Sequence, residues 1–245
     1  FRSGIPKETS AFTVNKACGS GLKAILLAAQ EIMLGNAKVM VAGGTESMSR
    51  VPYLIDNARW GLRMGNQPLV DGMYRDGFND PLSGMVMGET AEELAKRYEI
   101  ARDEQDEYAL RSQQRAAAAI DGGKFDQEIV PLQLKTRKGE VIFARDEHPR
   151  ANTTTDDLKK LSPVFSQHGT ITAGNSSGIT DGAAAVMVMT EDALKSSAAE
   201  PLARQVLRAA GVPEVLVEGH ALGESLGGDD TLGHRRLLSK PCASA

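Results

Sequence analysis

The sequence has few cysteines, few aromatic residues and no long apolar run. Of its 245 residues, 2 are cysteines and 4% are aromatic. Cys18 and Cys242 lie far apart, so they offer neither a disulfide framework nor metal-ligand spacing, and no metal site is predicted. Such sparse cysteine usage is typical of a reducing compartment, here the cytoplasm or an organelle matrix. No apolar run approaches the length of a membrane span, so no membrane association is expected.

The charge is weakly negative and contains no basic block. The chain has 28 Lys and Arg against 32 Asp and Glu, a net charge of −4 at pH 7. A nucleic-acid or acidic-lipid partner would require a basic surface, so neither is expected. The remaining composition, with 41% hydrophobic residues and 25 glycines, is that of an ordinary globular α/β protein. The length suffices for one large domain or two modest ones.

A strand, a tight turn and a helix are predicted around Cys18. Residues 11–17 (AFTVNKA) have the β-branched content of a short strand, and the turn CGSG follows directly. From Leu22 to Met33 apolar residues recur at helical spacing, and residues 38–44 (KVMVAGG) form an apolar run typical of a buried strand. This strand-turn-helix-strand order predicts a parallel sheet.

The rest of the chain is predicted to alternate loops, helices and strands. Residues 45–88 lack sustained periodicity and are predicted to be long loops. Thr90 and Glu93 have capping-box spacing, which predicts that a helix opens there and runs to about residue 98. Further elements are expected as helices over 102–121 and 157–161, and as strands over 128–134, 140–144, 183–189 and 202–207.

Cys18 stands where a nucleophile would be favoured, between the predicted strand and the predicted helix. The thiolate is the reactive form of cysteine, and the positive end of a helix dipole stabilises an anion. Gly19 and Gly21 leave room for a substrate carbonyl and for backbone donors that would stabilise an oxyanion. A lone cysteine without context would more simply be a buried structural thiol. The surrounding residues therefore decide between the two interpretations.

Residues 14–25 (VNKACGSGLKAI) resemble the acyl-enzyme signature of the thiolases, the acetyl-CoA C-acyltransferases. The similarity continues in residues 43–49 (GGTESMS), 87–92 (MGETAE), 102–106 (RDEQD) and 172–178 (TAGNSSG). The resemblance implies that Cys18 accepts an acyl group from acyl-CoA and passes it to the carbon of a second acetyl-CoA, or catalyses the reverse cleavage. It implies a coenzyme A thioester as substrate and no permanently bound cofactor.

The same resemblance implies a set of coenzyme A contacts. In thiolases the loop matching residues 172–178 lies along the pantetheine arm of CoA, so Ala173, Gly174 and Ser177 are expected contacts. Met87 falls on a position that borders the acyl pocket, and Arg150 matches an arginine near the nucleotide end of CoA, where a guanidinium can pair with phosphate or stack on adenine. Taken alone, the loop would be a simple turn and Arg150 a solvated surface residue.

The resemblance also implies the fold, a thiolase-like layered α/β fold (αβαβα) that is incomplete and carries an inserted loop domain. Residues 1–46 and 179–210 would form the partial core, residues 47–178 the inserted loop domain, and residues 211–245 a divergent tail. The sequence begins at Phe1 without an initiator methionine or a signal segment. We therefore expect a chain truncated at both ends, whose full-length parent is a homo-oligomer, a dimer or a tetramer.

The remaining catalytic groups of a thiolase are a histidine and a second cysteine, which move protons at the nucleophile and at the substrate α-carbon. Residues 219–225 (GHALGES) are similar to the family's histidine motif, which makes His220 a candidate, but they come early in the chain and a chance match is the favoured alternative. Cys242 lacks the glycines of the second cysteine motif. Two other functions consequently stay open: a catalytically inactive CoA-binding or subunit-interaction protein, and another condensing relative such as a ketoacyl synthase.

Overall fold

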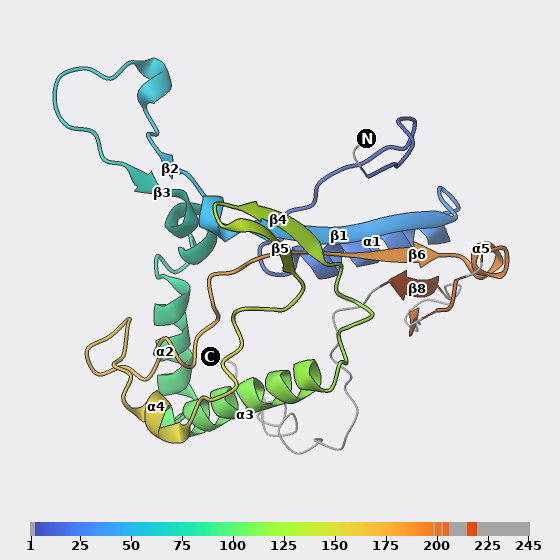
Figure 1. The fold of residues 1–245 in the computed structure, drawn as a ribbon. Coiled ribbons are helices and arrows are strands. Elements are labelled where there is room, and N and C mark those ends of the chain that lie inside the picture. Colours follow the sequence, from blue (N-terminus) through green and yellow to red (C-terminus); the bar gives the residue numbers. More distant parts are fainter. Residues whose placement is uncertain (1–2, 198, 202, 206–214, 220–245) are drawn as a thin grey trace, which may run out of the picture.

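The computed structural model describes residues 3–197, 199–201, 203–205 and 215–219. Figure 1 shows a sheet with α1 packed along one face, and below it a region of helices and loops that contains α2, α3 and α4. The helices are α1 (Ser20–Met33), α2 (Met87–Arg97), α3 (Arg102–Asp121), α4 (Thr155–Lys159) and α5 (Glu191–Lys195). The strands are β1 (Val39–Ser47), β2 (Tyr53–Leu54), β3 (Val70–Asp71), β4 (Leu132–Thr136), β5 (Gly139–Phe143), β6 (Asp181–Met189), β7 (Ala203–Gln205) and β8 (Val215–Gly219).

The main sheet has the strand order β1-β6-β8-β7, and all its described pairs are antiparallel. The prediction of a parallel sheet is therefore wrong for the described strands. The prediction rested on a strand expected over residues 11–17. The connection through the helix would have made β1 run parallel to that strand. That segment forms no strand, only an isolated bridge between Lys16 and Cys18. The neighbour of β1 is instead β6, which comes from far along the chain.

The core of the sheet region lies between α1 and one face of β1 and β6. In the register, Met40 stands opposite Val188 and Ala42 opposite Val186, so these four side chains share a face. The fully buried cluster consists of Ala28, Ala29, Ile32, Ala42 and Val188. The small alanines let α1 approach the sheet closely, and the predicted apolar spacing of this helix is confirmed in its second half. Its first predicted position, Leu22, is exposed.

The helix α2 begins earlier than its predicted capping box. The Glu89 carboxylate accepts a hydrogen bond from the Val86 backbone N–H at 2.9 Å, whereas the Thr90 hydroxyl donates to the Met87 carbonyl at 2.6 Å. The prediction that Thr90 and Glu93 open the helix is therefore wrong, because a glutamate one turn earlier already satisfies the free N–H at the start of the helix. The helix predicted over residues 102–121 is confirmed by α3.

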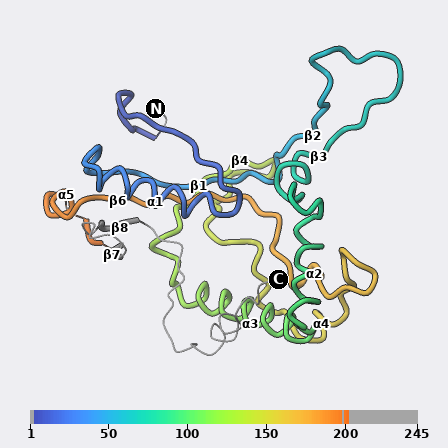
Figure 2. Tube along the Cα trace, turned by 180° about the vertical axis from the view of Figure 1, so that it is seen from behind, coloured from blue at the N-terminus to red at the C-terminus, as the bar shows by residue number. Residues whose placement is uncertain are grey.

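Loops were predicted over residues 45–88, but residues 45–47 belong to β1 and residues 87–88 to α2. Residues 48–86 carry little regular structure, as predicted. They contain two short 3-10 turns, a five-residue π-helical turn (Tyr74–Phe78) and the two-residue ladder between β2 and β3. The chain between β2 and β3 extends away from the rest of the molecule (Figure 2). It carries exposed Trp60, Leu62 and Met64. None of the described helices is both long and apolar enough to cross a bilayer.

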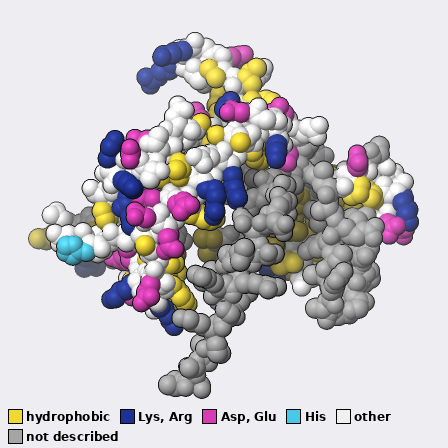
Figure 3. All heavy atoms as spheres, turned by 90° about the horizontal axis from the view of Figure 1, so that it is seen from below, with side chains coloured by type: hydrophobic (Ala, Val, Ile, Leu, Met, Phe, Trp, Pro, Cys, Tyr) yellow, Lys and Arg dark blue, Asp and Glu magenta, His cyan; other side chains and the backbone are white. Residues whose placement is uncertain are grey.

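Charged side chains of both signs are mixed on the described surface. Figure 3 shows Lys and Arg next to Asp and Glu over the face seen from below. Ion pairs among the described residues include Arg145 with Asp121 at 2.9 Å and Lys195 with Glu191 at 2.9 Å. Mixed charge of this kind produces no large field of one sign on that face, which agrees with the small net charge.

Candidate active site

Cys18 lies on a tight, strained turn directly before α1. Ala17 has φ 47°, a left-handed conformation that is unfavourable for a residue with a side chain. The turn is closed by hydrogen bonds from the Gly19 N–H to the Lys16 carbonyl at 3.1 Å and from the Ser20 N–H to the Ala17 carbonyl at 3.0 Å. The thiol of Cys18 is free and its side chain is exposed. The alternative of a buried structural thiol is therefore wrong.

Ser20 ties the two sides of this turn together. Its hydroxyl accepts a hydrogen bond from the Lys16 N–H at 2.8 Å and donates one to the Ala17 carbonyl at 2.7 Å. A hydroxyl that both donates and accepts across the turn fixes the strained Ala17 conformation. The position of Cys18 between Ala17 and Gly19 is thereby fixed as well.

The N-terminus of α1 is open toward Cys18. Gly19 is the N-cap and no side chain caps the helix; no acidic residue stands in its first turn. The first N–H groups of a helix lack partners within the helix, and they carry the positive end of its dipole. The Ser20 N–H is already used in the turn, so the following N–H groups of the first helical turn are the ones that can act on an anion or a developing oxyanion near Cys18. The local geometry matches the requirements of a thiolate nucleophile with backbone oxyanion donors.

The segment that carries the predicted CoA contacts enters the sheet at the same end as Cys18. Because α1 and β6 both run opposite to β1, the start of α1 lies at the start of β6, as Figures 1 and 2 show from two sides. Ser177 stands four residues before Asp181, the first residue of β6. Asp181 is bound to Ser49 after β1, through the Ser49 N–H at 2.9 Å and through the Ser49 hydroxyl. This contact fixes the point at which the loop joins the sheet.

Four of the predicted contact residues lie on two segments, α2 and the loop before β6. Met87 is the first residue of α2, and its side chain is exposed. Ala173 and Ser177 are exposed on the loop before β6, and Gly174 is half-buried. A Cβ on Gly174 would lie 2.6 Å from the side chains of both Leu158 and Leu161, so the side-chain direction of this residue points to α4 and any ligand would meet its backbone.

Arg150 has an anchored backbone and an exposed side chain. Its N–H donates to the Gln113 side-chain oxygen at 2.7 Å, and its carbonyl accepts from the Thr153 hydroxyl at 2.8 Å. The guanidinium is exposed to solvent. It is therefore available for an anionic group. His220 and Cys242 lie outside the described residues.

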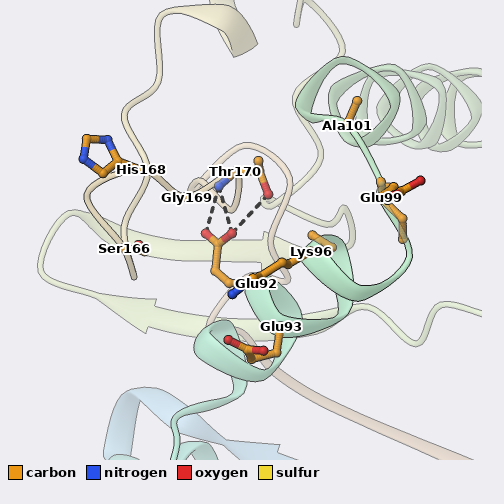
Figure 4. A pocket seen from close by; sticks show the side chains of 11 residues that line it. Glu92, Glu93, Lys96, Glu99, Ala101, Ser166, His168, Gly169 and Thr170 are labelled. Atoms are coloured by element: carbon orange, nitrogen blue, oxygen red, sulfur yellow. Dashed lines mark hydrogen bonds between the residues drawn. The ribbon is translucent and has the colours of Figure 1, made fainter.

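A hollow of about 390 Å³ lies beside α2, between this helix and residues 166–170. Figure 4 shows its lining, with Glu92 directed at Thr170 and His168 turned away from that contact. The Glu92 carboxylate accepts hydrogen bonds from the backbone N–H of Thr170 and of Ile171, each at 2.9 Å. None of the predicted site residues that the structure describes lines this hollow. The residues that line the hollow hold the loop in place, and none of them belongs to the nucleophile turn.

The sequence-based prediction missed the residues that hold the loop. Half-buried hydrogen bonds join the segment 158–176 to Glu92 on α2 and to Arg102 on α3. Asn175 of the segment bonds to Asp106 on α3, which also pairs with Arg102. A signal for them was present, because the residues stand inside the segments 87–92, 102–106 and 172–178 that carry the resemblance. Among the described residues, no group of His, Cys, Asp and Glu side chains has the arrangement of a metal site.

Comparison with known proteins identifies the family. The family model of the thiolase N-terminal domain matches residues 1–192. The chain belongs to the thiolase family. A Staphylococcus epidermidis protein named "Probable acetyl-CoA acyltransferase" is 51% identical over 204 residues, which are 83% of this chain and 52% of that protein. "Acetyl-CoA acetyltransferase" of Syntrophomonas wolfei is 47% identical over 221 residues, 89% of this chain and 56% of that protein.

Solved thiolase structures share the fold. Human mitochondrial 3-ketoacyl-CoA thiolase superposes with a TM-score of 0.76 and 47% identity, over 80% of this chain and 49% of that chain. The same human enzyme solved in complex with CoA gives a TM-score of 0.74 at 46% identity, over 80% of this chain and 48% of that chain. The thiolase-like α/β fold expected from the sequence is thus confirmed. The thiolase chain described here spans about half the length of the curated relatives that it matches.

Proposed function

We propose that this thiolase chain transfers acyl groups between CoA thioesters through an S-acyl-Cys18 intermediate. The observation that carries the proposal is the exposed thiol of Cys18 on a fixed turn at the uncapped N-terminus of α1. The family membership and the names of the relatives support the reaction class. The CoA-bound human thiolase supports a CoA thioester as the substrate.

In the first step the Cys18 thiolate attacks the carbonyl carbon of acetyl-CoA. A bond forms between the Cys18 sulfur and that carbon, the bond from the carbon to the CoA sulfur breaks, and CoA leaves as a thiolate that takes up a proton. The carbonyl oxygen carries negative charge in the tetrahedral intermediate, and the free N–H groups at the start of α1 are the donors that would stabilise it. The acetyl group then remains on Cys18.

In the second step the α-carbon of another acetyl-CoA attacks the S-acyl group, which yields acetoacetyl-CoA and restores the Cys18 thiolate. In reverse, Cys18 accepts the acyl group from a 3-ketoacyl-CoA and releases acetyl-CoA. The base that activates the Cys18 thiol has His220 as its sequence-based candidate, and deprotonation of the α-carbon requires a second acid-base group. We place Met87 at the acyl group, Ala173, Gly174 and Ser177 along the pantetheine arm, and Arg150 near the nucleotide.

The division of the chain belongs to the same proposal. Residues 1–46 and 179–210 would form the thiolase core, residues 47–178 the inserted loop domain, and residues 211–245 a divergent tail. The antiparallel pairing of β1 with β6 supports a core assembled from two distant segments. We further propose a homo-oligomeric parent and a cytoplasmic or organelle-matrix location, where acyl-CoA substrates are available.

Incubation of the purified chain with acetyl-CoA, followed by intact-mass measurement and peptide mapping, tests the proposal. We expect a mass increase of one acetyl group on the Cys18 peptide, absent from Cys18→Ser and retained in Cys242→Ser. An unmodified Cys18 peptide at saturating acetyl-CoA would refute acylation. The alternative function, a CoA-binding or subunit-interaction protein without catalysis, predicts CoA binding with no such adduct.

A further inference from the structure

The loop before β6 is attached to α2 through the half-buried Glu92 and to α3 through the buried carboxylate of Asp106. Asp106 on α3 is only 2% exposed, and its two oxygens accept hydrogen bonds from different partners. One oxygen accepts from the Asn175 amide nitrogen at 3.0 Å, and the other from the Arg102 guanidinium at 2.7 Å. A buried carboxylate persists only when it is paired and hydrogen-bonded, so these contacts define the position of Asp106.

Arg102 extends this network to α4. Its guanidinium donates to the Leu158 carbonyl at 2.6 Å and to the Leu161 carbonyl at 3.1 Å. Leu158 lies in the last turn of α4 and Leu161 follows that helix, and Gly174 packs against the side chains of both. Asp106 therefore joins α3, the end of α4 and the loop at one point.

Both the oxygen and the nitrogen of the Asn175 side-chain amide form hydrogen bonds within the loop. Its oxygen accepts from the Thr172 N–H at 2.7 Å, and its nitrogen donates to the Thr170 carbonyl at 3.1 Å as well as to Asp106. Thr172 is fully buried inside this loop. The amide of Asn175 is thus paired both within the loop and with Asp106, and Ala173 and Ser177 remain on the outside.

We propose that Asp106 is a positioning residue for acyl-CoA binding, which acts through Asn175 to hold the loop 170–177 in its binding conformation. The inference rests on the proposed function, because that function gives the loop its role along the pantetheine arm. A loop that is already ordered loses little conformational freedom when a ligand binds. Loss of the Asp106–Asn175 contact should therefore weaken the binding of CoA without changing the chemistry of Cys18.

The test compares Asp106→Asn and Asn175→Ala with the wild-type chain and with Glu107→Gln, the exposed neighbour of Asp106 on α3. Three quantities are measured: the acetyl-CoA concentration that gives half-maximal acylation of Cys18, the limiting acylation rate, and the rate of Cys18 alkylation by iodoacetamide. For Asp106→Asn and for Asn175→Ala we expect the half-saturating concentration to rise about tenfold. An effect of this size is expected when binding of the ligand must also order one loop. The limiting rate, the alkylation rate and the Glu107→Gln variant should stay at wild-type values.

Hydrogen exchange of the loop amides supplies the structural readout, and circular dichroism verifies that each variant is folded. Faster exchange over residues 170–176 together with the raised half-saturating concentration supports the inference. Faster exchange with an unchanged concentration, or a fall in the limiting rate alone, overturns it. Asn175→Ala leaves the Arg102–Asp106 pair in place and decides the question if Asp106→Asn does not fold.

Calorimetric titration with CoA separates this inference from the proposed function. If the wild-type chain binds CoA, loses affinity in both variants and yet forms no acyl adduct, the acyl-transfer proposal fails and the role of Asp106 stands. If Cys18 is acylated equally in all variants, the acyl-transfer proposal stands and the role of Asp106 is refuted. A wild-type chain that binds no CoA refutes the role of Asp106 as well.

Discussion

In the sheet region, α1 contacts β1 and β6 through small and medium apolar side chains, whereas the loop 170–177 is attached to α2 and α3 by charged and amide side chains. Apolar packing is non-directional, so its strength follows the area removed from water. A buried polar network depends on the direction of each hydrogen bond, and an unpaired member carries its full desolvation cost. Apolar packing in the first region thus positions the nucleophile turn. In the second region the directions of the hydrogen bonds determine the conformation of the loop 170–177.

Removing the cation of the buried pair should have the largest effect on stability. Arg102→Ala leaves the Asp106 carboxylate buried with only the Asn175 amide as partner, which should lower the free energy of unfolding by about 3 to 5 kcal/mol. Urea unfolding followed by circular dichroism measures the change. Lys195→Ala is the matched control, because Glu191 and Lys195 form an ion pair of the same spacing on the surface. Equal losses in both variants would remove the distinction between the two pairs.

Creating a cavity under α1 should have the next largest effect. Ile32→Ala removes a side chain that is 6% exposed and packs against the β1–β6 face, which should cost about 3 kcal/mol in unfolding free energy. Leu22→Ala on the same helix is the control, since Leu22 is 65% exposed. We expect the Ile32 variant to leave amide exchange in the loop 170–177 unchanged. Faster exchange there would show that the two regions unfold as one unit.

The Glu92 contact should give a smaller and local effect. One Glu92 oxygen accepts from the Thr170 and Ile171 N–H groups, and the other accepts from the Thr170 N–H and hydroxyl. Glu92→Gln removes one of these two acceptor oxygens, which should cost about 1 to 2 kcal/mol. Amide exchange at Thr170 and Ile171 should accelerate, while exchange in α1 stays the same. Glu93→Gln, one residue further along α2 and exposed, should change neither.

The smallest expected effect is a pH dependence at the junction of the two regions. Hydrogen bonds from the Ser49 hydroxyl and N–H, with a contribution from Arg50, hold the pKa of Asp181 below its ordinary value of 3.8. A lowered folded-state pKa means that this contribution to stability is complete above pH 3.8 and is lost as the pH falls from there through the folded-state pKa. The Ser49 amide resonance should titrate in that window by NMR. Ser49→Ala should move the titration of Asp181 toward 3.8, and an unshifted midpoint would contradict the contact.

Local sequence patterns predicted those elements whose formation is determined by residues close together in the chain. The helix over 102–121 and the turn at Cys18 were predictable because apolar period and glycine placement act within a few residues. The pairing of β1 with β6 was not, because antiparallel neighbours can come from any distance along the chain. The start of α2 was also misplaced, since Thr90 and Glu93 have the same spacing as a real capping pair.

The candidate site was predictable in part for a similar reason. The family signature marked Cys18 and the loop residues Ala173, Gly174 and Ser177, whose roles stay predictions. Asp106 was not singled out, because an aspartate in an amphipathic helix is usually solvated and only the tertiary structure brings Asn175 to it. Residues that hold a site through another residue leave no spacing pattern of their own in the sequence.

Trp60, in the excursion between β2 and β3, is the single tryptophan of the chain and is 82% exposed. Its indole is already surrounded by water in the native state. Unfolding of α1 or release of the loop before β6 would therefore leave tryptophan emission nearly constant, and fluorescence melting curves would underreport both events. The same property makes the residue a built-in probe: a blue shift of the emission would signal that another molecule has covered this excursion.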